Sequence, residues 1–370
     1  MDAELQPIHA RVMEAGTPED LFDSKDVVLP PEMLLNYLEQ KYAPLKAITN
    51  PQSYQSPADA EAAGDADEKL ERLYALAQER IRNHVYGIEG RGRPRPAYAK
   101  KSFDVGPNRY FLGTKLWDGE HISLHEAFME RDGVSVGEVV IKVAKDPSHN
   151  HIVDAEVRNL DILHATPVPQ WKHLPYIMDR FQSGGRQGIV QRKISGHPLS
   201  EIRRHRAHKN GLDRKHMVWI MDRCLSCLGY VHRQRLVHGA LDPERIIVQA
   251  RSHNALIVGW SAAVYEPARS GERTAVPAGD FTAPEVRDRG NIGPWSDIYS
   301  LGKLMIWLLG GDISTNQIPE GIEEPWAPFL QSLVAADYLK RPTDAWEVHQ
   351  QECTIKDKLW KRMYLHLDMS

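Results

Sequence analysis

The sequence predicts an α+β protein in which a small strand-rich lobe precedes a larger helical lobe, with a small helical domain in front of both. Three observations carry this prediction. Apolar and polar residues alternate from about Gly106, as they do in half-buried strands. After Gly196 apolar residues recur at helical spacing, and a helical stretch up to about Gly90 ends in a segment rich in Gly and Pro. The predicted helical domain, linker, two lobes and tail span residues 1–90, 91–105, 106–193, 194–352 and 353–370.

The composition excludes several classes of protein. Hydrophobic residues make up 42% and charged residues 26% of the chain, as in an ordinary globular protein. A net charge of −4 is too mild to indicate a nucleic-acid binder. The first residues lack the basic and apolar segments of a signal peptide, and no apolar run approaches the ~20 residues of a membrane helix. We therefore expect no nucleic-acid or membrane partner and a cytoplasmic location.

The three cysteines, Cys224, Cys227 and Cys353, fit a reducing compartment. Cys224 and Cys227 lie close together in an apolar helical pattern, which is half a metal site at most. No second Cys or His pair accompanies them, and no histidine pairs with a nearby Cys or Glu at zinc spacing. The sequence thus predicts core thiols and no metal.

The N-terminal stretch predicts two amphipathic helices, at residues 30–48 and 67–81, because apolar side chains recur there at helical spacing. The polar segment 49–67 between them contains Pro and Gly and predicts a loop. The two helices must pack as an antiparallel pair to bury their apolar faces. The basic segment Gly87–Lys101 that follows predicts a solvated connector.

Period-two alternation predicts a series of strands after this linker. The first two, at 109–117 and 121–129, should form a hairpin around Asp118-Gly119. After Gly196 the pattern is mostly helical, with one strand pair around Ile246 and Ile257. The other elements predicted for the first lobe are a strand at 137–146, a short amphipathic helix at 152–163, and strands at 174–182 and 187–194.

Six short segments follow one another along the chain: VVIKVA, LVHGALDPERIIV, ALIVGWSAA, FTAPEV, WSDIYSLGKLMIWLL and KRPTDAWE. In this order and at these spacings they resemble the protein-kinase family between Gly106 and Gln350. The resemblance implies a bilobal protein-kinase-like fold with a cleft for ATP.

The resemblance also implies roles for individual residues. Lys142 would reach the α- and β-phosphates of ATP, and Glu156 would be its ion-pair partner. Gly119 would belong to the glycine-rich loop over the phosphates. That loop keeps only Gly113 and Gly119, and Glu120 would oppose a phosphate.

In the helical lobe the resemblance implies three structural residues. Asp297 would tie down the backbone of the catalytic loop, and Glu285 would pair with Arg341. At all three positions this sequence has the residue type that the resemblance requires.

The residues that carry kinase chemistry are replaced. Ala240 stands where the resemblance places the catalytic Asp, and alanine cannot accept the proton of a substrate hydroxyl. Gly259 replaces the metal-binding Asp, and Arg245 puts a cation where the metal-binding Asn belongs. Asp242 and Glu244 lie nearby, but neither is well placed to act instead. We expect no catalytic residue and no metal at these positions.

The chain also resembles a narrower bacterial group that joins an N-terminal J-like (DnaJ-type) region to a kinase-like domain. The HGA triplet and the aromatic residue after the metal position recur in that group. Its His-Pro-Asp signature corresponds here to Asn50, Pro51 and Gln52, so the J-like motif is degenerate. Because the changed residues are those that act on the heat-shock chaperone, this argues against a chaperone partner.

Three functions follow as hypotheses. The first is a pseudokinase that acts as a regulatory or scaffolding module for a protein partner. Its cleft would hold no certain cofactor, or ATP without Mg²⁺, with Lys142 and Arg245 neutralising the phosphates. The second is an active serine/threonine kinase or other ATP-dependent transferase with atypical catalytic residues. The third is a J-domain co-chaperone.

Overall fold

The computed structural model contains both helices and strands. Contacts divide the chain into two compact units, one of residues 1–114, 125–139 and 167–169, the other of residues 115–124, 140–166 and 170–370. The structure describes residues 6–16, 20, 42–43, 45–47, 49, 56–86, 100–165, 168–250, 253–274, 278–322, 324–360 and 367–369.

The first unit contains α1 (Gln6–Glu14) and the long α3 (Pro57–Tyr86). Apolar side chains of the two helices are buried, among them Val12 and Leu70. The expected helix at 30–48 lies mostly outside the described residues, and so do Asn50, Pro51 and Gln52.

The start of α3 corrects a sequence prediction, because residues from Pro57 onward were expected to form a loop. Ser56 caps the helix, its Oγ accepting a hydrogen bond of 3.1 Å from the Asp59 amide. Pro57 suits the first helical position. The alanines that follow have the highest helix propensity of any residue, and they outweigh the polar composition.

Six strands form one sheet in the order β1-β2-β3-β4-β6-β5. Strand β1 occupies the last residues of the predicted linker, which is a second correction. Its residues pair antiparallel with β2 across a turn at Gly106, whose φ of +55° suits glycine. The strands are β1 (Ser102–Val105), β2 (Asn108–Asp118), β3 (Ile122–Arg131), β4 (Val134–Ala144), β5 (Ile177–Ser183) and β6 (Arg186–Arg192).

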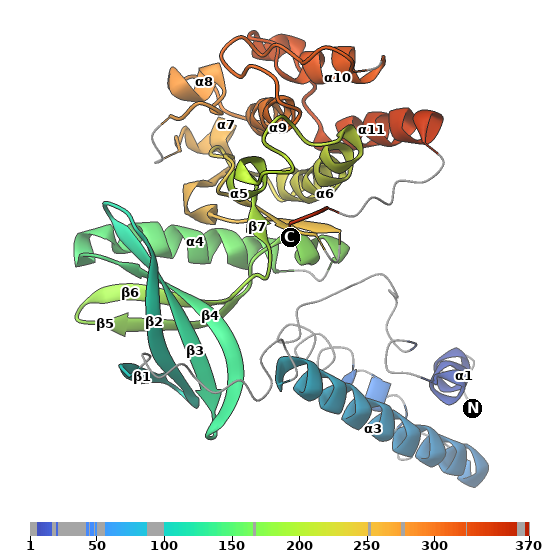
Figure 1. The fold of residues 1–370 in the computed structure, drawn as a ribbon. Coiled ribbons are helices and arrows are strands. Elements are labelled where there is room, and N and C mark those ends of the chain that lie inside the picture. Colours follow the sequence, from blue (N-terminus) through green and yellow to red (C-terminus); the bar gives the residue numbers. More distant parts are fainter. Residues whose placement is uncertain are drawn as a thin grey trace. The chain divides into compact units, whose positions relative to one another are not determined.

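Helix α4 (Asn150–Leu163) packs on β6 (Figure 1). A small core of Ala144, Val153 and Ile189 joins β4, the helix and β6. Every third or fourth residue of α4 is apolar, so one face meets the sheet and the opposite face is left polar.

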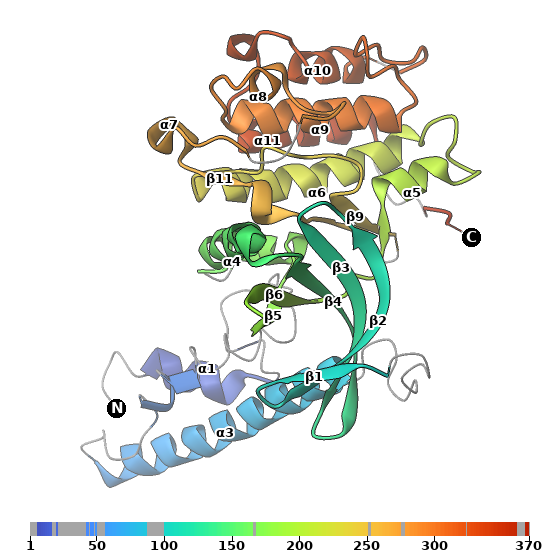
Figure 2. The ribbon, with the colours of Figure 1, turned by 90° about the vertical axis from the view of Figure 1, so that its left-hand side faces the viewer.

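In the second unit, α9 (Pro294–Leu308) contacts α10 (Trp326–Leu333) and α6 (Arg214–Arg233), and α6 in turn contacts α11 (Ala345–Leu359) (Figure 2). Almost the whole of α9 is buried, as its apolar sequence requires. Helix α11 runs through the predicted boundary at 352–353, because its helical spacing continues past that point.

Shorter elements complete this unit. A three-stranded sheet has the order β10-β9-β7, and β8 pairs with β11. The bounds are β7 (His197–Pro198), β8 (Leu236–Val237), β9 (Ile246–Gln249), β10 (Asn254–Ile257), β11 (Val264–Tyr265), α5 (Leu199–Arg204), α7 (Pro267–Ser270), α8 (Pro284–Arg287), and the 3-10 turns η3 (Pro147–His149), η4 (Pro169–His173), η5 (Trp260–Ala262) and η6 (Tyr338–Lys340).

Within the described residues, no helix combines the length and apolar character that crossing a membrane requires.

Candidate functional site

The loop between β8 and β9 is held by one buried carboxylate. Asp297, at the start of α9, accepts hydrogen bonds from the amides of His238 and Gly239, both at 2.8 Å. His232 Nε2 donates a third at 2.9 Å. Burial acts to raise the pKa of Asp297, but the bond from His232 and the neighbouring donors outweigh it, so the pKa is lowered. The carboxylate therefore fixes the loop backbone, the role that the resemblance implies.

Arg245 folds back over this loop. Its Nη1 donates to the carbonyl oxygen of Ala240 at 2.6 Å and forms an ion pair with Asp242. Gly259, just before η5, has a φ of +84°, and a Cβ added there would lie 3.0 Å from Arg245 Cδ and Nε. The arginine side chain thus fills the space that a side chain at position 259 would need. The two replacements form one packed arrangement.

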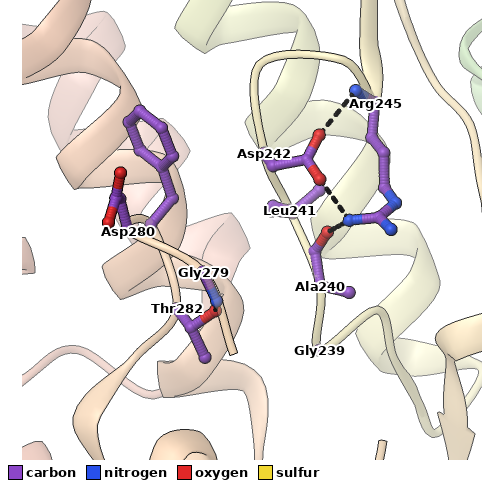
Figure 3. A pocket seen from close by; sticks show the side chains of 9 residues that line it. Gly239, Ala240, Leu241, Asp242, Arg245, Gly279, Asp280 and Thr282 are labelled. Atoms are coloured by element: carbon purple, nitrogen blue, oxygen red, sulfur yellow. Dashed lines mark hydrogen bonds and ion pairs between the residues drawn. The ribbon is translucent and has the colours of Figure 1, made fainter. Parts of the chain in front are cut away.

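A pocket of about 100 Å³ opens beside Ala240 and Arg245. Figure 3 shows the guanidinium of Arg245 turned toward the Ala240 carbonyl and the Asp242 carboxylate, with the Gly279–Thr282 segment on the other wall. The pocket therefore joins the loop after β8 to the segment that leads into α8.

The two carboxylates considered as substitutes are both engaged. Asp242 forms an ion pair with Arg245, and its Oδ1 accepts hydrogen bonds from the backbone amides of Glu244 and Arg245 at 2.9 and 3.0 Å. Glu244 instead forms an exposed ion pair of 3.3 Å with Arg204. Sequence reasoning missed Asp280, an exposed residue that lines the pocket.

Lys142 on β4 forms a buried ion pair with Glu156 of α4. Gln191 Nε2 donates to the other carboxylate oxygen of Glu156 at 3.1 Å. Both oxygens of Glu156 are therefore satisfied although the side chain is almost fully buried. Sequence reasoning also missed Asn159 on the same helix, which donates to the carbonyls of Trp260 and Ala263 at 2.8 and 2.9 Å. These bonds fasten α4 to η5, next to Gly259.

Gly119 lies in the turn between β2 and β3, where its carbonyl accepts a hydrogen bond of 2.8 Å from Lys145. The indole of Trp117 covers the glycine so closely that an added Cβ would lie 1.8 Å from it. Asp118 pairs with Lys145 and Lys115, which lower its pKa to about 2, with the Lys145 hydrogen bond as the larger cause. The glycine therefore makes room for an aromatic ring in this structure, and ion pairs close the turn.

Glu285 and Arg341 form a two-fold hydrogen-bonded ion pair. The Nη1–Oε1 and Nη2–Oε2 distances are 2.9 and 3.1 Å, and both side chains are buried. Ser296 Oγ donates to Glu285, and Arg341 also donates to the carbonyls of Ala335 and Ala336. The pair joins α8 to the segment before α11.

Known proteins similar to this chain are serine/threonine-protein kinases. It is 23% identical over 276 residues to the probable serine/threonine-protein kinase pknA2 of Bifidobacterium longum, covering 68% of this chain and 35% of that protein. It is 24% identical over 183 residues to serine/threonine-protein kinase PAK 1 of Mus musculus, covering 44% of this chain and 33% of that protein. The chain has a protein-kinase-like fold. The α+β lobes predicted from sequence agree with this at the level of fold class.

A third kinase-like relative is the inactive leucine-rich repeat receptor-like serine/threonine-protein kinase At5g24100 of Arabidopsis thaliana. It is 29% identical over 96 residues, covering 26% of this chain and 16% of that protein. No family model matches the chain. The kinase-like chain spans about a third of the length of the first two relatives.

Proposed function

We propose that this kinase-like protein is a pseudokinase that serves as a regulatory or scaffolding module for a protein partner. The observation that carries the proposal is the position of Arg245. Its guanidinium bonds the Ala240 carbonyl and lies against Gly259, so a protein cation packs between the two positions where an active kinase has carboxylates. Such a cation repels Mg²⁺.

The same arrangement supports ATP binding without a metal. Of the three side-chain nitrogens of Arg245, only Nη1 has hydrogen-bond partners among the described residues, and a quarter of the side chain is exposed. A guanidinium has five N–H donors, so Nη2 and Nε remain for a phosphate. Lys142, held by Glu156, would supply a second cation as the resemblance implies. These two cations would then neutralise the phosphate charge that Mg²⁺ neutralises in an active kinase.

The second candidate is an active transferase, and the pocket gives it one supporting observation. Asp280 is exposed and lines the same pocket as Ala240, and a rotation of its side chain would be needed to bring the carboxylate to a substrate hydroxyl there.

One incubation separates the two candidates. We expect no phosphopeptide and no other modified product when the full chain is incubated with labelled ATP, a mixed peptide substrate, and Mg²⁺ or Mn²⁺. The reason is that Ala240 and Gly259 carry no carboxylate, so neither position can bind a metal or accept the proton of a hydroxyl. Mass analysis of the products makes the measurement. A product that disappears in both Lys142→Met and Asp280→Asn, and survives in the exposed-site control Asp161→Asn, would establish the transferase instead.

The N-terminal residues 1–90 enter this proposal as a degenerate J-like domain. The packing of α1 against α3 supports a helical region there. A co-chaperone role has only the resemblance behind it, and the replaced Asn50 and Gln52 count against it.

A further inference from the structure

A cluster of metal-ligand side chains joins α6 to α11, and none of its members lines the pocket at Arg245. Ligand atoms of Asp222, His349, Glu352 and Cys353 all lie within 4.8 Å of one another. The last three stand at positions i, i+3 and i+4 of α11, and so on one helix face. The prediction that no histidine pairs with a nearby Cys or Glu at ligand spacing is therefore wrong. The fourth side chain comes from α6, which packs along α11.

Glu352 is the member of this cluster whose buried carboxylate has the fewest favourable contacts. It is 0% exposed, and neither carboxylate oxygen has a hydrogen-bond partner of normal geometry among the described residues. Its ion-pair contact is with Lys356, whose Nζ lies 3.5 Å from Oε2. Buried carboxylates are normally paired and hydrogen-bonded, coordinate a metal, or take up a proton, and burial raises the pKa of Glu352 to about 7. This oxygen pair, aimed into a group of ligand atoms, points to a cation.

Lys356 supplies a loosely held cation. Its Nζ lies 3.3 Å from Asp222 Oδ2 and 3.5 Å from Cys353 Sγ. The two distances to carboxylate oxygens, 3.3 Å to Asp222 and 3.5 Å to Glu352, exceed the roughly 2.7–2.9 Å of a charge-assisted N–H···O hydrogen bond. His349 also donates to Asp222, at 2.5 Å. A lysine side chain has a flexible four-carbon stem, so its ammonium can leave the cluster without moving α11.

We propose that Asp222, His349, Glu352 and Cys353 form a zinc site that fastens α11 to α6. Zn²⁺ takes thiolate, imidazole and carboxylate ligands at roughly 2.0–2.3 Å, and four protein ligands make a closed, structural site. On binding, the Cys353 thiol loses its proton to solvent, and the ammonium of Lys356 moves out. The proton on His349 Nε2 is exchanged through solvent onto Nδ1, so that Nε2 binds the metal in place of its bond to Asp222.

The test uses the full chain after treatment with EDTA and gel filtration. Titration with Zn²⁺ against a chromophoric chelator should show one ion per chain, and Co²⁺ should give a thiolate charge-transfer band. Cys353→Ala should lose that band and lower zinc affinity at least about tenfold, on the scale of changes around metal ligands. Cys227→Ala is the matched control, because it removes a buried thiol of α6 outside the cluster. It should bind zinc like the wild type.

The variant Lys356→Met distinguishes a zinc site from a cluster whose negative charge is neutralised by Lys356 alone. Because the competing ammonium is removed, this variant should bind zinc more tightly than the wild type. The proposal is overturned if the wild-type chain takes up neither Zn²⁺ nor Co²⁺ at micromolar concentrations, if Cys353→Ala and Cys227→Ala bind alike, or if Lys356→Met abolishes uptake.

Discussion

Replacing Arg245 by alanine is expected to weaken ATP binding at least about tenfold in buffer that contains EDTA. A hydrogen bond to a charged group contributes roughly 1.5–3 kcal/mol, and about 1.4 kcal/mol is a factor of ten. The substitution also leaves the carboxylate of Asp242 without its cation, and that carboxylate would then repel the phosphates. Isothermal titration calorimetry of the wild type and Arg245→Ala gives the comparison directly.

The matched control for this variant is Arg204→Ala. Arg204 is exposed, pairs with Glu244 at 3.3 Å and does not line the pocket, yet its loss changes the net charge by the same amount. We expect Arg204→Ala to bind ATP as the wild type does. Equal ATP affinity in the wild type and Arg245→Ala would show that Arg245 does not contact ATP.

Asp297→Asn should lower the free energy of unfolding by about 3 kcal/mol at pH 7, since it breaks a buried, hydrogen-bonded charge interaction. The carboxylate accepts from two backbone amides and from His232, and an asparagine turns one acceptor into a donor. Urea unfolding of the two proteins measures the difference. The exposed control Asp161→Asn, which breaks a surface pair with Arg180, should change the free energy of unfolding by about 1 kcal/mol or less.

The effect of Asp297→Asn should depend on pH in one direction. The pKa of Asp297 is lower in the folded protein than in the unfolded chain, where aspartate has a pKa of about 3.9. The stability that its charge contributes is therefore present above about pH 4 and is lost as the pH falls through the folded pKa. The difference between wild type and variant should narrow below about pH 4. A difference that stayed constant between pH 7 and pH 3 would show that the charge of Asp297 contributes nothing.

Sequence patterns were most informative where local periodicity decides the structure. The alternation in β4 and the helical spacing of α4 follow from side chains that must face one core, so both elements could be predicted. The start of α3 and strand β1 could not. The first depends on a single cap at Ser56, and the second on pairing with β2 rather than on its own few residues.

The same distinction applies to the residues of the candidate site. The order of the motifs predicted Lys142, Glu156 and Asp297, and the structure places the first two in one ion pair. The packing of Arg245 against Gly259 could not be predicted, because it depends on how an arginine side chain folds back over its own loop. The contact of Asp222 with α11 likewise joins residues far apart in sequence, although the spacing of His349, Glu352 and Cys353 was visible beforehand.

The most direct test of the account is calorimetric titration of the wild-type chain with ATP, in EDTA and again in excess Mg²⁺. In the proposed site, the cations of the protein take the place of the metal. We therefore predict that ATP binds in EDTA and that Mg²⁺ leaves the affinity for ATP unchanged or makes it weaker. ATP that bound only with Mg²⁺, or at least tenfold more tightly with it, would contradict the account.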